Sequence, residues 1–367
     1  MRCRVPVRIA IAAALVLLAV SIGTAQRADH PAATAILPNV TPTVTLNVDV
    51  SSNRKPISPY IYGLNFAKPS FAAEIGVPVR RWGGNATSRY NWQLNATNHA
   101  SDWFFHNNTH YDPFTFANET ADQWVIQNKQ TGAESLLTLP MTGYVAKNGS
   151  QSTCGFHRAN YPVQDHWNGA DGFPDCGDGF SSGVPIVNNP LDTSIAVTQT
   201  FAAGWATHLI ATHGTAVNGG VKFYDLDNEP GLWHETHRDA HPIPLSYDES
   251  IARGTAYAAA VKAVDPGALI LGPVQDGWTR YWYASYESQA QAEADRTNHG
   301  GTYFVPWYLQ QMNAYQQAHG IRLLDYLDLH VYPQNGVALA TAGNASTQAL
   351  RLRSTRSLWD STYVDES

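Results

Sequence analysis

Strand-like and helix-like segments alternate along most of this 367-residue chain. Stretches rich in β-branched, aliphatic and aromatic residues predict six strands, at 60–66, 77–85, 134–145, 221–230, 268–274 and 323–333. Three helices are predicted, from about Thr198 to His213, from Ser246 to Val264 and from Val305 to His319. Repeated strand-helix-strand units predict a parallel sheet.

We expect this sheet to be that of a (β/α)8 barrel, the TIM-barrel fold. The chain contains no GxGxxG or GxxxxGK fingerprint of a doubly wound, nucleotide-binding sheet. A closed barrel needs about eight strands, and the pattern supplies about six. Residues 58–367 are therefore expected to form an incomplete barrel domain, with the remaining strands beyond Ser367.

The N-terminus has the pattern of an export signal. Three arginines precede an uncharged stretch rich in Ala, Val, Leu and Ile, which predicts a signal peptide over residues 1–25. Residues 26–43 are expected to be a flexible leader. The alternating sequence VTLNVDV within 44–57 predicts a strand of a small accessory β-sheet domain. An uncleaved anchor helix is the alternative, disfavoured because no stop-transfer pattern follows, so we expect a secreted, extracellular monomer.

Composition limits the class of partner. The formal net charge is -7, only 14% of residues are charged, and Lys and Arg form no block. Nucleic acids and anionic membranes demand clustered positive charge, so we expect neither as a partner. Once the signal peptide is removed, Cys154 and Cys176 remain, and we expect them to form a disulfide that closes a loop. A zinc site is the weaker alternative, since no CxxC spacing is present.

The predicted strand at 221–230 ends in residues suited to acid-base chemistry. Asp227, Asn228 and Glu229 stand there, followed at once by Pro-Gly. Active sites of barrels lie where strands end and βα loops begin. Glu229 is therefore predicted to protonate a glycosidic oxygen, with Asn228 binding the sugar 2-hydroxyl. The alternative is that Asp227 and Glu229 only bind backbone amides of the loop.

Other residues near predicted strand ends are candidates for binding. We expect Arg80 or Arg81 to orient a carboxylate, the other arginine to pack on the neighbouring strand, and Asn85 to contact a sugar hydroxyl. Sugar rings stack on aromatic side chains, and the candidates for such a cleft are Trp82, Trp92, Trp103 and Trp233. Burial in the core is the alternative for each tryptophan.

At the end of the last predicted strand, His330 and Tyr332 alternate with apolar residues, so both are expected to face the barrel mouth. His330 is then a candidate to hydrogen-bond a sugar or a catalytic carboxylate. A structural histidine is the alternative.

Two clusters raise the question of a metal. His234, Glu235, His237 and His241 fit HExH rather than the HExxH spacing of zinc proteases, so zinc catalysis is disfavoured. A structural calcium is an open prediction in the Asp- and Gly-rich loop that holds Asp171, Asp175 and Asp178. No cofactor is expected for catalysis.

Four motifs together resemble glycoside hydrolase family 44, the endoglucanases and xyloglucanases that act on β-1,4-glucans. They are RRWGGNATSRYNWQLN (80–95), DLDNEPGLWHETHRDAHP (225–242), LDLHVYPQ (327–334) and RSLWDSTYVDES (356–367). The resemblance implies a TIM barrel with a β-sandwich domain, to which residues 44–57 would contribute a strand. It also implies retention of anomeric configuration, acid-base catalysis by Glu229 beside Asn228, and a glutamate nucleophile on strand seven.

That nucleophile would lie beyond Ser367, so this chain by itself is expected to be inactive. Glu366 is rejected as a substitute, because it precedes the missing strand. Two other functions stay open from the sequence. One is another retaining barrel glycosidase such as an α-L-arabinofuranosidase, although many loop aromatics favour the open cleft of an endo-acting enzyme. The other is a carbohydrate-binding protein without catalysis.

Overall fold

The computed structural model describes residues 49–52, 54–109, 120–332, 343–364 and 366. The chain divides into two units, Met1–Pro56 and Ile57–Ser367. Residues 49–52 and 54–56 of the first unit contain no strand or helix. The predicted signal peptide, the leader and most of the strand predicted at 44–50 lie outside the described residues.

One six-stranded parallel sheet forms the centre of the second unit. Its strands pair in the order β1 (Gly63–Asn65), β2 (Val79–Trp82), β5 (Glu134–Leu139), β12 (Phe223–Leu226), β13 (Leu269–Gln275) and β14 (Tyr326–Leu329). Every pair in this sheet is parallel, and strands adjacent in space follow one another along the chain. This topology is that of a (β/α)8 barrel with six of its strands, which confirms the predicted fold.

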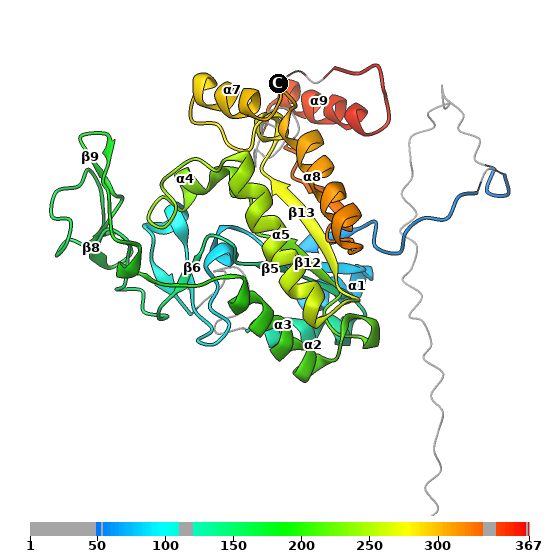
Figure 1. Ribbon diagram of the computed structural model, residues 1–367, viewed down its shortest axis with the longest axis horizontal. Helices are drawn as coiled ribbons and strands as arrows, with labels where there is room; N and C mark the ends of the chain where they lie inside the picture. Colours follow the sequence, from blue (N-terminus) through cyan, green and yellow to red (C-terminus); the bar gives the residue numbers. More distant parts are fainter. Residues whose placement is uncertain (1–48, 53, 110–119, 333–342, 365, 367) are drawn as a thin grey trace, which may run out of the picture. The chain divides into compact units, whose positions relative to one another are not determined.

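Helices connect these strands and cover the outer face of the sheet. The main ones are α1 (Pro69–Ile75), α2 (Ala121–Thr131), α3 (Gln199–His213), α5 (Tyr247–Val264) and α8 (Phe304–His319). Helix α5 packs against both α3 and α8, and Figure 1 shows these three helices side by side over the strands. None of the described helices is long and apolar enough to cross a membrane.

The predicted helices are α3, α5 and α8, whereas α1 and α2 were not predicted. At the start of α5, the Ser246 hydroxyl accepts a hydrogen bond from the Glu249 backbone N–H at 3.1 Å. The Glu249 carboxylate does not return to the cap, because it binds His241 at 2.9 Å and Arg253 at 2.7 Å. The spacing Ser-x-x-Glu is that of a capping box, and here its serine alone forms the cap.

The other helices and strands are shorter and lie outside the six-stranded sheet. They are helices α4 (Trp233–Thr236), α6 (Trp278–Trp282), α7 (Gln289–Asn298) and α9 (Ala345–Ser354), and the paired strands β3 (Thr97–Asn98) with β4 (Asn107–Asn108), β6 (Tyr144–Ala146) with β11 (Ser194–Ala196), β7 (Trp167–Asn168) with β8 (Phe173–Gly177), and β9 (Phe180–Ser181) with β10 (Val184–Pro185). Figure 1 shows β8 and β9 projecting away from the barrel, in the long segment between β5 and α3.

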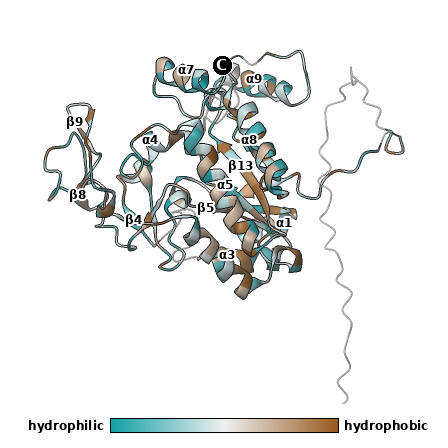
Figure 2. Ribbon diagram, viewed as in Figure 1, coloured by the Kyte–Doolittle hydropathy of each residue, from teal (hydrophilic) through white to brown (hydrophobic). Residues whose placement is uncertain are grey.

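Aromatic side chains fill the space between sheet and helices. Trp82 of β2 meets Trp124 of α2 with ring centroids 5.6 Å apart, and both side chains are almost fully buried. The guanidinium of Arg80 lies 3.8 Å from the centroid of the Trp124 ring and donates from Nε to the Ala67 carbonyl at 3.0 Å. Arg80 is thus the arginine of the predicted pair that packs in the structure. Figure 2 shows that the sheet strand β13 is hydrophobic, whereas helix α7 is largely hydrophilic.

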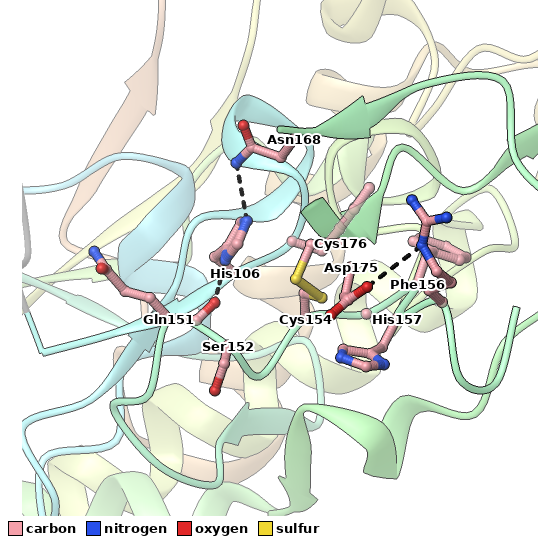
Figure 3. Close-up of a disulfide and its surroundings, with 12 residues drawn as sticks. His106, Gln151, Ser152, Cys154, Phe156, His157, Asn168, Asp175 and Cys176 are labelled. Carbon is pink, nitrogen blue, oxygen red and sulfur yellow. Dashed lines mark hydrogen bonds and ion pairs between the residues drawn. A yellow bond between two sulfur atoms is a disulfide. The ribbon is translucent and has the colours of Figure 1, made fainter. Parts of the chain in front are cut away.

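The projecting segment is tied together by a disulfide between Cys154 and Cys176, both buried, with Cα atoms 5.9 Å apart. Figure 3 shows its surroundings, where His106 bridges Asn168, at 3.0 Å, and the backbone carbonyl of Gln151. A covalent link here restricts a segment whose strands are only two to five residues long.

Replacing both cysteines by alanine is expected to lower the free energy of unfolding by about 3 kcal/mol. The bond spans 22 residues, and loop closure of that length removes roughly this amount of entropy from the unfolded chain. Urea titration of the C154A/C176A variant beside the wild-type protein measures the change. An unchanged unfolding midpoint would show that the segment is held by its other contacts.

Candidate active site

The chain bends sharply where β12 ends. Asp227 and Glu229 have positive φ angles of 69° and 49°, which place two non-glycine residues in the left-handed region. Such backbone conformations are costly and concentrate at functional sites. The backbone N–H of Glu229 donates to the Val274 carbonyl at 3.0 Å, at the irregularity in the β13–β14 ladder.

A buried carboxylate holds this bend. Asp227 is fully buried and accepts hydrogen bonds from the Ser88 hydroxyl and from the backbone N–H of Met141. It also accepts from the Asn228 backbone N–H at 2.7 Å and from the Trp233 indole N–H at 3.4 Å. Burial raises the pKa of Asp227, and these four donors act in the opposite direction. The carboxylate of Asp227 therefore binds backbone amides of the loops, which is the structural role that the sequence left open for it.

Glu229 faces the end of β14. His330 Nδ1 lies 2.7 Å from its Oε1, and the Tyr332 hydroxyl donates to the same oxygen at 3.1 Å. The side chain of Glu229 is 13% exposed, and its Oε2 accepts no hydrogen bond from the residues that the structure describes. The structure thus brings together the three residues that the sequence placed at the barrel mouth. One carboxyl oxygen is fixed, and the other is available to a substrate.

Arg81 orients the amide beside Glu229. Its Nε contacts Asp225 at 2.7 Å, and its Nη2 donates to Asn228 Oδ1 at 3.0 Å. The Asn228 Nδ2 group then points to Asn85 Oδ1, at 3.2 Å. Because the guanidinium donates only, it fixes which end of the amide is the carbonyl. Arg81 is therefore the arginine of the predicted pair that serves the site.

Asp276 is a site residue that the sequence analysis missed. It follows β13 directly, and its side chain is 15% exposed. Burial raises the pKa of Asp276 to about 6; the Arg280 guanidinium opposes this rise and the charge of Glu229 adds to it. A signal was present in the sequence, because Asp276 stands at the end of a predicted strand, as Glu229 does.

Two of the predicted cleft tryptophans are core residues. Trp82 is 1% exposed and Trp233 is 0% exposed, so neither ring can stack on a sugar, and this prediction is wrong for both. Side chains alternate along a strand, and on β2 it is Arg81 that contacts the residues after β12, while Trp82 packs on α2. Trp92 packs against helix α3, where its ring stacks on that of His208 with the ring centroids 5.1 Å apart.

Trp103 remains a candidate for sugar binding. It is partly exposed, and its indole N–H donates to Asp171 at 2.7 Å. The structure shows no ligand role for it, so its place in a cleft stays a prediction.

The residues considered for metal binding have other partners. Asp171 binds Trp103, Asp175 pairs with Arg158 at 3.4 Å, and Asp178 pairs with His166 at 2.8 Å. Within the described ranges, no three or more His, Cys, Asp or Glu side chains gather to hold an ion. The predicted calcium site is therefore not formed by these aspartates.

In the HExH motif, the side chains do not converge on one point, and both ring nitrogens of His237 are buried without a hydrogen-bond partner among the described residues. Glu235 pairs with Arg280 at 3.0 Å, and His241 pairs with Glu249 at 2.9 Å. His237 is fully buried, and burial lowers its pKa well below the usual value.

Comparison with known proteins gives the same family along most of the chain. Residues 96–335 match the family model of glycoside hydrolase family 44. The chain is 32% identical to endoglucanase A of Paenibacillus lautus over 344 residues, which cover 88% of this chain and 45% of that protein. It therefore spans about half the length of this curated relative.

Solved structures agree. CelM2, a bifunctional glucanase-xylanase protein from a metagenome library, superimposes with a TM-score of 0.79 at 41% identity, covering 86% of this chain and 62% of that one. A family 44 xyloglucanase of Paenibacillus polymyxa gives a TM-score of 0.68 at 30% identity, covering 87% and 62%.

Replacing Asp276 by asparagine is expected to raise the melting temperature more at pH 7.5 than at pH 4. The pKa of this carboxyl is raised to about 6 from an ordinary 3.8. Its protonated form stabilises the folded state at low pH, and that contribution is lost as pH rises through 6, whereas the neutral amide does not titrate. Thermal unfolding across this range measures the difference, with Glu74→Gln on the exposed face of α1 as the control. A difference that does not vary with pH would contradict this account.

Proposed function

This chain belongs to glycoside hydrolase family 44, and on that premise we propose that it cleaves internal β-1,4 linkages of glucans such as cellulose derivatives and xyloglucan. The observation that carries the proposal is the Glu229 carboxyl at the end of β12, anchored through Oε1 by His330 and Tyr332. The names of relatives, an endoglucanase and a xyloglucanase, support the choice of substrate. An α-L-arabinofuranosidase is correspondingly disfavoured.

In the proposed mechanism, Glu229 Oε2 gives its proton to the glycosidic oxygen while a second carboxylate attacks the anomeric carbon. This forms a glycosyl-enzyme with the leaving group departed, and Glu229 then takes a proton from the water that hydrolyses it, with net retention. The resemblance assigns the attacking group to a glutamate on a seventh strand, which the six-stranded sheet of the described residues does not include.

Tyr332 and Asn228 have side chains that fit the roles of hydrogen-bond donors in this mechanism. Burial, followed by the charge of Glu229 and its hydrogen bond, raises the pKa of Tyr332 to about 12. The phenol therefore keeps its proton at neutral pH and donates to the carboxylate that is left after proton transfer. Asn228, with its Nδ2 group directed by Arg81, is placed to bind the sugar 2-hydroxyl beside the reacting carbon.

We further propose that the protein is secreted and acts as a monomer. The N-terminal pattern supports export, and the disulfide between Cys154 and Cys176 suits an oxidising compartment. A carbohydrate-binding protein without catalysis is the competing function, and the following experiment separates the two.

Replacing Glu229 by glutamine in the intact natural enzyme is expected to lower kcat on glucan by roughly 10²–10⁴-fold, because proton donation is lost. An activated aryl glycoside needs little protonation of its leaving group, so its cleavage step should suffer less. Added azide should restore turnover on that substrate, because it replaces the water that Glu229 would activate.

Steady-state rates on both substrates, with and without azide, measure these effects, and Glu74→Gln again serves as the control. Near-normal activity of the Glu229→Gln variant on glucan would remove Glu229 from the acid-base role. An equal loss on both substrates with no azide rescue would do the same. No hydrolysis by the parent enzyme would favour the carbohydrate-binding protein.

A further inference from the structure

An exposed aromatic segment follows β13 directly. Trp278 begins helix α6 and is 72% exposed, although it lies next to other aromatic rings. Its ring centroid is 5.3 Å from that of Trp282 and 6.1 Å from that of Tyr281, at interplanar angles of 78° and 67°. No ring therefore lies parallel on Trp278 in these pairs. A tryptophan held by its neighbours but left in water is a common feature of binding surfaces.

This segment is fastened to the residues that hold Glu229. The Tyr281 hydroxyl donates to the backbone carbonyl of His330. A Cβ atom on Gly277, the residue before Trp278, would lie 4.0 Å from the Tyr332 ring. His330 and Tyr332 are the two residues bonded to Glu229 Oε1. The segment that begins with Trp278 is therefore attached to the two residues that hold Glu229, at the carboxyl edge of the sheet.

Asp276 adds an unused acceptor to the same segment. Its Oδ1 is buried and accepts no hydrogen bond from the described residues, and the Nε of Arg280 is 3.5 Å away in an ion pair without hydrogen-bond geometry. The buried Oδ1 is out of reach of a ligand, so a sugar hydroxyl would meet this carboxylate at its other oxygen, Oδ2, which lies on the exposed part of the side chain.

We propose that Trp278 and Asp276 form a sugar subsite that binds one glucosyl unit next to the linkage cleaved at Glu229. A glucopyranose ring with equatorial substituents presents C–H groups on its faces and hydroxyls at its rim. The indole of Trp278 receives the face by stacking, and Asp276 accepts a hydrogen bond from a rim hydroxyl. This inference rests on the proposed function, because the ligand is a segment of the same glucan.

The test is calorimetric binding of cellohexaose and of xyloglucan oligosaccharides, measured in a Glu229→Gln background to prevent hydrolysis. Trp278→Ala is expected to raise Kd by about 10-fold, whereas Trp278→Phe keeps a stacking face and stays within about 3-fold. Asp276→Ala should also weaken binding. Tyr62→Ala is the matched control, because Tyr62 is also 72% exposed but precedes β1, at the opposite edge of the sheet.

An unchanged Kd for Trp278→Ala overturns the inference, and if the parent enzyme still hydrolyses glucan, the proposed function stands. If the parent neither binds these oligosaccharides nor hydrolyses glucan, both are wrong. Sedimentation of the same variants covers the other occupant, a second copy of the chain. Loss of self-association in Trp278→Ala with unchanged sugar affinity would assign the surface to that contact and overturn the subsite.

Discussion

The site depends on one buried carboxylate, that of Asp227. Its four donors come from three separate places: Ser88 after β2, Met141 after β5, and Asn228 and Trp233 next to Glu229 itself. Removing an acceptor from such a network leaves several buried donors without partners, which is more costly than the loss of one hydrogen bond. Asp227 therefore joins the ends of neighbouring strands and fixes the left-handed bend from which Glu229 projects.

The fold was largely predictable because hydrophobic stretches and helix boundaries are local signals. All six strands and the three longest helices follow from them, and so does the position of Asp227, Asn228 and Glu229 at the end of β12. The small paired strands between β5 and α3 could not be predicted, since they are two to five residues long and are held by a disulfide and side-chain contacts. Such contacts depend on tertiary structure and leave no periodic pattern.

Individual side chains of the site were harder to assign than the strands. In RRW, the sequence identified an arginine and a tryptophan for the site, but period-two alternation lets only one face of β2 contact Asn228. Arg81 does so, while Arg80 and Trp82 meet at Trp124 of α2. The register that decides between these faces is set by pairing with β5, which is information from outside the motif. Asp276 and Trp278 were harder to predict, because they follow β13 in a stretch that carries no catalytic motif of its own.

In the proposed mechanism, the hydrogen bonds of Glu229 also decide which of its oxygens donates the proton. With a proton on His330 Nδ1, both His330 and Tyr332 donate a hydrogen bond to Oε1. A proton on Oε1 would then point toward two other donors, which is unfavourable. The acid that the mechanism requires is therefore formed at Oε2, the oxygen that accepts no hydrogen bond from the described residues. After transfer, the negative charge is drawn toward Oε1, where two donors stabilise it. In this mechanism the pair that orients the acid also stabilises its conjugate base, and the asymmetry between the two oxygens arises because His330 and Tyr332 both follow the end of β14.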